Sequence, residues 1–88
     1  MPATRRLRPP LPADGVVRIL RERRRASSVS VVTGLLPAEI DEIAALLKRH
    51  CGSGGTAKSG VVEIQGDHRE KIARWFVDRG RKVKLAGG

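Results

Sequence analysis

Apolar and polar residues alternate in two stretches near the start of the chain, and both stretches have the composition of β-strands. Residues 16–20 (Val-Val-Arg-Ile-Leu) and 28–33 (Ser-Val-Ser-Val-Val-Thr) are rich in β-branched and aliphatic side chains. One face of the second stretch carries Val29, Val31 and Thr33, with Val32 on the other. The polar link between the stretches, residues 21–27, is short, which predicts an antiparallel hairpin.

The pattern then changes to the spacing of an amphipathic helix. Gly34 ends the strand, and Pro37 suits the first helical position because its missing N–H is not needed there. The apolar stripe of this helix consists of Leu36, Ile40, Ile43, Ala44 and Leu47. Acidic residues near its start, and Lys48 and Arg49 near its end, complement the helix dipole. Gly52 is the expected C-terminal stop.

A third strand, a second helix and a last strand are predicted in the C-terminal part of the chain. Residues 60–65 alternate as a half-buried strand does, with Val62 and Ile64 on one face and Glu63 and Gln65 on the other. A helix follows over about residues 68–79, with Asp67 and Glu70 at the spacing of a capping box. Residues 82–85 alternate again and predict the last strand.

The element order is therefore β-β-α-β-α-β. Right-handed crossovers put both helices on the same face of the sheet. The predicted fold class is α/β, a two-layer sandwich with a mixed sheet and two helices on one face. We assign residues 15–88 to this domain and residues 1–14, which hold Arg5, Arg6 and Arg8 among prolines, to a flexible basic arm. A fraying terminus without a function is the alternative interpretation of that arm.

Charge points to a class of partner. The 88 residues carry 18 Lys and Arg against 9 Asp and Glu, a net charge of +9, which favours a polyanion such as RNA. The alternative interpretation is that the positive charge only keeps the protein soluble. A chain of this length fits one small domain and leaves no room for a catalytic domain beside a substrate domain. Trp75 and Phe76 are the only aromatic residues, whereas sheet-based binders of single-stranded RNA usually stack bases on aromatic rings.

Cysteine content and hydropathy bear on location. Cys51 is the only cysteine, so no intrachain disulfide can form, and a reducing cytosol is expected. No apolar run approaches the ~20 residues of a membrane span. The N-terminal arginines are not followed by the apolar segment of a secretory signal. We therefore expect a cytoplasmic protein without a membrane partner.

The densest positive charge surrounds the tip of the predicted hairpin. It consists of Arg18, Arg21, Arg23, Arg24 and Arg25. Arginine has the bidentate geometry that suits phosphate, so contact with an RNA backbone is favoured over the alternative of a merely solvated charge run. Lys48, Arg49 and Lys58 are further candidate contacts that would widen the RNA-binding surface.

The segment Gly52–Ser59 nearly spells a phosphate-binding P-loop. Ala57 stands where that motif has glycine, and the segment leaves a helix and enters a strand, the reverse of P-loop order. We therefore expect Gly54 or Gly55 to take a positive φ or to lie in a turn. Lys58 would then give RNA phosphate a supporting contact, and no nucleotide would bind.

Two histidines lie beside residues that could share a reaction or a metal. His50 precedes Cys51 and His68 follows Asp67, but neighbours in sequence rarely face each other, and a zinc site needs about four ligands in paired spacings. We expect no catalytic residue, no metal and no cofactor. Cys51 is then a small buried apolar residue, and Asp67 is a helix cap.

One succession of blocks is more specific than any of these patterns. A helix leads into a glycine loop, a short alternating strand follows, and Gly66-Asp67-His68-Arg69 opens the next helix. With the ending Lys82-Val83-Lys84-Leu85-Ala86-Gly87-Gly88, this order resembles the core signature of the translation initiation factor 1 family, in its bacterial and archaeal branch. The resemblance covers roughly residues 15 to 88 and implies the same architecture.

The resemblance implies a monomeric, non-enzymatic factor that binds rRNA of the small ribosomal subunit near the decoding site and promotes start-codon and initiator-tRNA fidelity. mRNA and initiator tRNA are further candidate partners. In the family a basic hairpin loop reaches toward the decoding site, and the turn that carries Asp67, His68 and Arg69 lies near the ribosomal surface. The loop of this chain is shorter, without glycine and richer in arginine.

Two alternatives remain open at this point. One is a ribosome-associated regulator of translation under stress, which would need the same surface. The other is a small nucleotide- or RNA-hydrolysing enzyme, against which the lack of paired carboxylates and metal-ligand spacings in the sequence argues.

Overall fold

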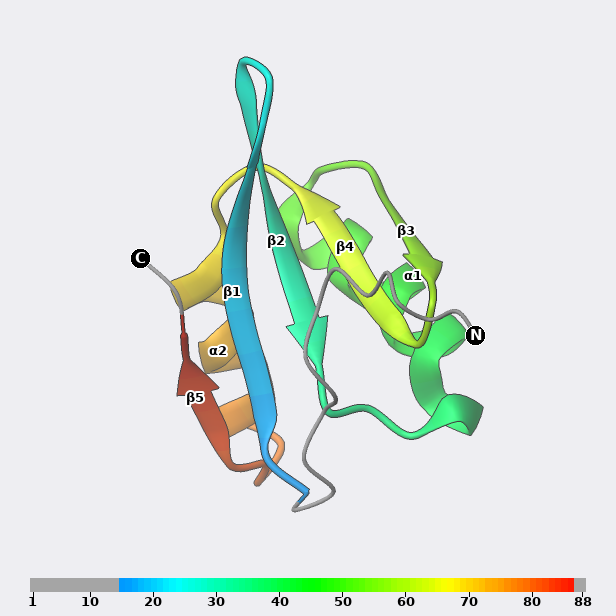
Figure 1. The fold of residues 1–88 in the computed structure, drawn as a ribbon. Coiled ribbons are helices and arrows are strands. Elements are labelled where there is room, and N and C mark those ends of the chain that lie inside the picture. The colour runs from blue at the N-terminus through cyan, green and yellow to red at the C-terminus, as the bar shows by residue number, and fades with distance from the viewer. Residues whose placement is uncertain (1–14, 87–88) are drawn as a thin grey trace, which may run out of the picture.

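The computed structural model describes residues 15–86 and is shown in Figure 1. Its elements, in chain order, are β1 (Val17–Arg24), β2 (Ser27–Thr33), a short 3-10 helix η2 (Pro37–Glu39), α1 (Ile40–Cys51), β3 (Gly55–Lys58), β4 (Val61–Gln65), α2 (Arg69–Val77) and β5 (Val83–Leu85). The strands form one sheet in the order β3-β4-β2-β1-β5. β1 and β5 are parallel and the other neighbours antiparallel, so the sheet is mixed. The predicted arm, residues 1–14, lies outside the described residues.

The predicted fold class is confirmed: the protein is a two-layer α/β structure whose helices cover one face of the sheet (Figure 1). The structure adds the strand β3 within the segment that was expected to be a glycine turn. The prediction that Gly54 or Gly55 takes a positive φ or lies in a turn was wrong: Gly54 directly precedes β3 and Gly55 begins it. The left-handed glycines lie on either side of β3, at Gly52 (φ 64) and Gly60 (φ 78). A Cβ at Gly55 would collide with the backbone carbonyl oxygen of Glu63, so glycine allows the two strands to approach there.

The main core lies between the sheet and the two helices. Its largest fully buried side chains are Phe76, Ile19, Leu47, Ile64 and Ile72. Cys51 is buried in this core, as predicted. Leu36, which was expected in the apolar stripe of α1, is 67% exposed because the chain is still extended there (φ −73°, ψ 143°) and the helix has not begun. None of the helices within residues 15–86 is long and apolar enough to cross a membrane.

A second apolar cluster lies on the sheet face opposite the helices. It contains Val29, Val31 and Val61, with Leu20 partly buried against them. Val32 belongs to the main core, so the predicted division of this strand between two faces is confirmed. The same alternation places Glu63 of β4, whose neighbours Val62 and Ile64 are core residues, on the face of this second cluster.

The β1–β2 hairpin projects beyond the rest of the sheet (Figure 1). β1 and β2 pair as far as Arg24 opposite Ser27, whereas pairing of β2 with β4 reaches only to Val29 opposite Gln65. The turn is therefore just Arg25 and Ala26, with φ 53° at Arg25. The link predicted over residues 21–27 was too long, because the charged residues Arg21–Arg24 occupy strand positions in the part of the hairpin that extends beyond the main core.

Candidate nucleic-acid interface

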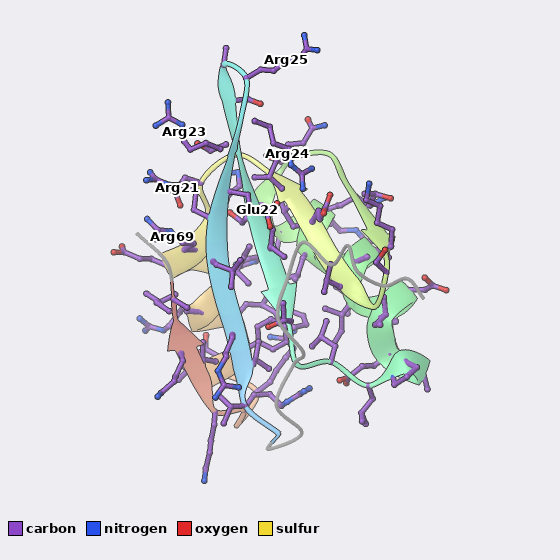
Figure 2. The ribbon with its side chains drawn as sticks, in the orientation of Figure 1. Arg21, Glu22, Arg23, Arg24, Arg25 and Arg69 are labelled. Atoms are coloured by element: carbon purple, nitrogen blue, oxygen red, sulfur yellow. The ribbon has the colours of Figure 1, made fainter. Side chains whose placement is uncertain are left out.

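The hairpin arginines divide between the two sides of β1. Because side chains alternate along a strand, Arg21 and Arg23 share a side with the core residue Ile19, and Arg24 lies on the side of the second apolar cluster. Figure 2 shows Arg21, Arg23 and Arg69 along the outer side of β1, Arg24 toward β4, and Arg25 at the tip. Arg23 and Arg25 are exposed, and Arg21 and Arg24 are partly buried. The sequence had predicted one cluster, and the structure separates it into two.

Arg24 is bound within the protein. Its Nη1 and Nη2 donate to the two carboxylate oxygens of Glu63, each over 3.0 Å, and Nη2 also donates to Glu22 Oε1 over 2.7 Å. The hydrogen bonds from Glu63 and then Glu22 raise the pKa of Arg24 above its already high ordinary value. Because its charge is matched by these two carboxylates, Arg24 contributes little net positive charge to the hairpin surface. Arg24 therefore has a role in the fold, which was not foreseen from the sequence for a residue of this cluster.

Asp67 joins β1 to the start of α2 through two arginines. Arg69 donates to both of its carboxylate oxygens, from Nε to Oδ1 over 3.0 Å and from Nη2 to Oδ2 over 3.3 Å. Arg21 Nη1 lies 3.6 Å from Oδ2. The Arg69 side chain first, then its backbone N–H, and finally the charge of Arg21 lower the pKa of Asp67 below its ordinary value.

The capping box predicted for Asp67 and Glu70 does not form. α2 begins at Arg69, its N-cap residue is His68, and no side chain caps it. Asp67 lies one position before the N-cap residue, and its carboxylate binds the guanidinium groups of Arg21 and Arg69 instead. Of the predicted bonding between Asp67 and backbone N–H groups at the helix start, only that with the Arg69 N–H remains, and it helps to lower the pKa of Asp67.

The turn that carries Asp67 is fixed to β2. The buried hydroxyl of Ser30 donates to the Gly66 carbonyl over 2.7 Å and accepts from the His68 backbone N–H over 2.8 Å. Gly66 also donates its backbone N–H to the Ser28 carbonyl, and His68 Nε2 lies 3.0 Å from Ser53 Oγ. Sequence reasoning missed Ser30, although a polar residue at a core-facing position of an otherwise apolar strand was a signal for it.

A hollow of about 560 Å³ lies beside this junction. It is lined by residues 67–71 and Leu85, so it lies where the start of α2 meets β5. Arg69 and Lys71 bring positive charge to its wall, and Asp67 and Glu70 bring negative charge. The hollow therefore extends the outer side of the hairpin with a polar surface of mixed charge.

The remaining predicted residues lie on other parts of the molecule. α2 packs against β1 and β5, whereas α1 packs against β3 and β4, so the molecule has two halves. Lys48 and Arg49 near the end of α1, and Lys58 at the end of β3, are exposed on the second half. Arg18 lies opposite Lys84 of β5, on the sheet face away from the helices. The structure thus brings together Arg21, Asp67, His68 and Arg69, with Arg23 and Arg25 farther along the hairpin.

The candidate nucleotide-binding, metal-binding and catalytic residues do not form such sites within residues 15–86. The glycines lead into β3 rather than into a helix, which is the reverse of P-loop geometry. Residues 15–86 contain no group of His, Cys, Asp and Glu side chains that could hold a metal ion. Burial raises the pKa of the Cys51 thiol, which opposes formation of a reactive thiolate.

Comparison with known proteins decides the family. The family model described as translation initiation factor SUI1 matches residues 13–83. The chain belongs to the SUI1 family. Its resemblance to initiation factor 1 is thereby confirmed, and the family places it in translation initiation, among translation factors rather than enzymes.

Relatives come from bacteria and archaea. The SUI1-family chain is 49% identical over 79 residues to a protein of Escherichia coli called YciH, described as uncharacterized, and this match covers 85% of the chain and 73% of the relative. It is 40% identical over 72 residues to a protein translation factor SUI1 homolog of Pyrococcus furiosus, covering 78% of the chain and 74% of the relative. A homolog of the same description from Thermoplasma volcanium is 37% identical over 76 residues, covering 83% and 76%.

Proposed function

We propose that this SUI1-family protein binds the small ribosomal subunit near the decoding site and promotes the choice of the correct start codon and initiator tRNA. It acts as a cytoplasmic monomer that contacts rRNA, and it catalyses no reaction. mRNA and initiator tRNA are further partners within reach of the hairpin. The observation that carries the proposal is the projecting hairpin with exposed Arg23 and Arg25, backed by the Arg21–Asp67–Arg69 junction.

The contacts are electrostatic. Arg23 and Arg25 lie where the hairpin has left the sheet, so a narrow two-stranded arm can enter a groove or cleft of folded RNA. Guanidinium groups bind phosphate oxygens in pairs of hydrogen bonds, and these contacts fix position without reading base sequence. Occupancy beside the decoding site then disfavours mismatched codon pairing by charge and shape alone.

Lys48, Arg49 and Lys58 are assigned a secondary place in this function. They lie on the α1–β3 half of the molecule, outside the Arg21–Asp67–Arg69 junction. On a subunit surface that spans both halves they would add phosphate contacts. Their removal should weaken binding less than removal of the exposed hairpin arginines.

Co-sedimentation with purified small and large ribosomal subunits, at low and high salt, tests the proposal. The expected result is selective binding to the small subunit that weakens steeply with salt, since each neutralised phosphate contributes about 0.7–0.9 to the slope of log K against log salt. Equal binding to both subunits, or no binding, contradicts it.

A regulator of translation under stress would use the same binding surface. Ribosome profiling at near-cognate start codons, with and without the protein, separates the two activities. Initiation at near-cognate codons should fall when the protein is present. A general fall in initiation at all codons would instead identify a repressor.

A further inference from the structure

We propose that Asp67 is a positioning residue for RNA binding: its carboxylate orders the guanidinium groups of Arg21 and Arg69 side by side, so that both contact phosphate. This inference rests on the proposed function. It concerns an acidic side chain inside a surface that binds a polyanion, where charge alone would make it unfavourable.

The geometry joins three elements at one carboxylate. Arg69, from the first turn of α2, meets Asp67 through two parallel hydrogen bonds, and Arg21, from β1, lies 3.6 Å from the same Oδ2. The three side chains keep exposed fractions of 40% for Asp67, 30% for Arg21 and 23% for Arg69. The junction is therefore open to solvent and accessible to a ligand.

The donors of Arg69 are only partly used within the junction. A guanidinium group has five N–H donors in one plane, and the bonds to Asp67 come from Nε and Nη2. The donors of Nη1 lie in the same plane, on an edge of the guanidinium group that points away from the carboxylate. A carboxylate on one edge thus leaves the other edge to meet a phosphate.

Positioning lowers the cost of binding. A long arginine side chain loses much rotamer entropy when a ligand fixes it. Asp67 imposes part of that order in advance on two arginines from different elements. The carboxylate is itself held in place, because both neighbours of Asp67 are bonded to the buried Ser30 hydroxyl: Gly66 through its carbonyl and His68 through its backbone N–H.

The comparison with Glu63 shows why Asp67 does more than neutralise charge. Glu63 is 4% exposed and binds Arg24 on the sheet face, where the pair belongs to the packing of the protein. Asp67 lies at the surface beside the polar hollow at the start of α2. Arg69, which lines this hollow, therefore faces a place that RNA can enter.

Two accounts of Asp67 predict opposite signs for one substitution. If the carboxylate acts only by repelling phosphate, Asp67→Asn adds one positive charge and tightens RNA binding. If it orders Arg21 and Arg69, Asp67→Asn weakens RNA binding although the net charge becomes more favourable. The sign of the change decides between them.

The test uses the full chain and purified small ribosomal subunits, with dissociation constants measured over a series of salt concentrations. We expect Asp67→Asn to weaken binding on the order of 5- to 10-fold, the cost of ordering two arginine side chains at binding. The matched control is Asp78→Asn, which makes the same charge change and releases Arg74 from an exposed ion pair at the other end of α2. The control should bind as wild type or slightly tighter.

A double-substitution cycle separates positioning from a general effect on the fold. In a background of Arg21→Gln with Arg69→Gln, Asp67→Asn should no longer weaken binding, because the residues it orders are gone. A second variant, Arg69→Lys, keeps the charge but loses the paired bonds to Asp67, and we expect weaker binding from it too. Melting temperatures of all variants show whether each is folded.

The outcomes are distinct. Asp67→Asn that binds as tightly as Asp78→Asn, or wild-type binding by Arg69→Lys, overturns the inference while the proposed function stands. The inference is also overturned, and the proposed function again stands, if Asp67→Asn weakens binding equally with and without Arg21 and Arg69. Failure of the wild-type protein to bind the small subunit overturns the proposed function and this inference with it.

Discussion

Arg24 and Glu63 form a bidentate ion pair across β2, so β1 is joined to β4, a strand that is not its neighbour in the sheet. Glu63 is buried, and Arg24 supplies the donors for both of its carboxylate oxygens. The pair lies over the second apolar cluster, on the face that carries Val29 and Val31. Arg24 is the last residue of β1 before the turn, so the pair ties the outer end of this strand back to β4, while Arg23 and Arg25 stay exposed.

The first prediction follows from the burial of Glu63. Arg24→Ala leaves a buried carboxylate without its main partner, so the free energy of unfolding should fall by about 1–3 kcal/mol. This is less than for a fully buried pair, because the Arg24 side chain is partly exposed and solvent screens the interaction. Arg23→Ala and Arg25→Ala are the matched controls on the same hairpin and should each change it by less than about 0.5 kcal/mol. Urea unfolding checks this. Equal stability of Arg24→Ala and Arg23→Ala would show that the ion pair does not support the fold.

The second prediction separates binding from stability. Replacing Arg23 and Arg25 together by alanine should leave the melting temperature unchanged and weaken binding to the small subunit. The slope of log K against log salt should become shallower by about 0.7–0.9 for each lost phosphate contact. Arg74→Ala, an exposed arginine near the end of α2, is the control and should bind as wild type. An unchanged salt slope in the double variant would contradict a role of the hairpin tip in RNA contact.

The third prediction concerns pH. Arg81 donates to both carboxylate oxygens of Glu39 over 3.2 Å, and this pair is the main reason why the pKa of Glu39 lies below its ordinary value of 4.5. The backbone N–H of Leu36 adds to the effect, and burial opposes it. Because the folded pKa is lowered, the pair stabilises the fold at pH above 4.5, and this stabilisation is lost as pH falls through the folded pKa.

The measurement compares urea unfolding of the wild type and Glu39→Gln from about pH 7 down to about pH 3. The difference in unfolding free energy should be roughly 0.5–1 kcal/mol at neutral pH, a small value because both partners are partly exposed. It should shrink below pH 4.5. Arg81→Gln should remove the same pH-dependent part, and a difference that stays constant over the range would contradict the ion-pair account.

Local pattern was enough to predict the fold class but not the hairpin contacts. Alternation put Val62 and Ile64 on one face of their strand, and helical spacing put Ile43 and Leu47 on one stripe of their helix. All four lie in the core, and these patterns could be read because each depends on residues close in sequence. The pair of Arg24 with Glu63 joins residues 39 positions apart. No periodicity reports such a contact, so a run of arginines that is partly bound within the protein looked like a uniform exposed cluster.

β3 was missed for a related reason. Glycine-rich segments have low strand propensity, and the run Gly52-Ser53-Gly54-Gly55 resembles a loop. In the structure Gly55 lies opposite Ile64, where the absence of a side chain allows the close approach of β4. The tertiary contact overrides the local preference, and the partner strand that creates it cannot be identified from the segment alone.

The last prediction concerns Ser30, whose hydroxyl links β2 to the turn before α2. The side chain is fully buried, donates to the Gly66 carbonyl and accepts from the His68 backbone N–H. Ser30→Ala leaves both backbone groups without this partner, so the free energy of unfolding should fall by about 1–3 kcal/mol. Binding to the small subunit should weaken as well, because the turn that carries Asp67 is no longer held.

Ser28→Ala is the matched control on the same strand. Ser28 contacts the turn through its backbone carbonyl, which accepts from the Gly66 N–H, and alanine keeps that bond. We therefore expect Ser28→Ala to unfold and bind as the wild type does. Urea unfolding and subunit binding are measured for both variants at the same salt concentration. If Ser30→Ala loses stability but binds the subunit with unchanged affinity, the Ser30 hydroxyl supports the fold alone, and the orientation of the Asp67 turn does not depend on it.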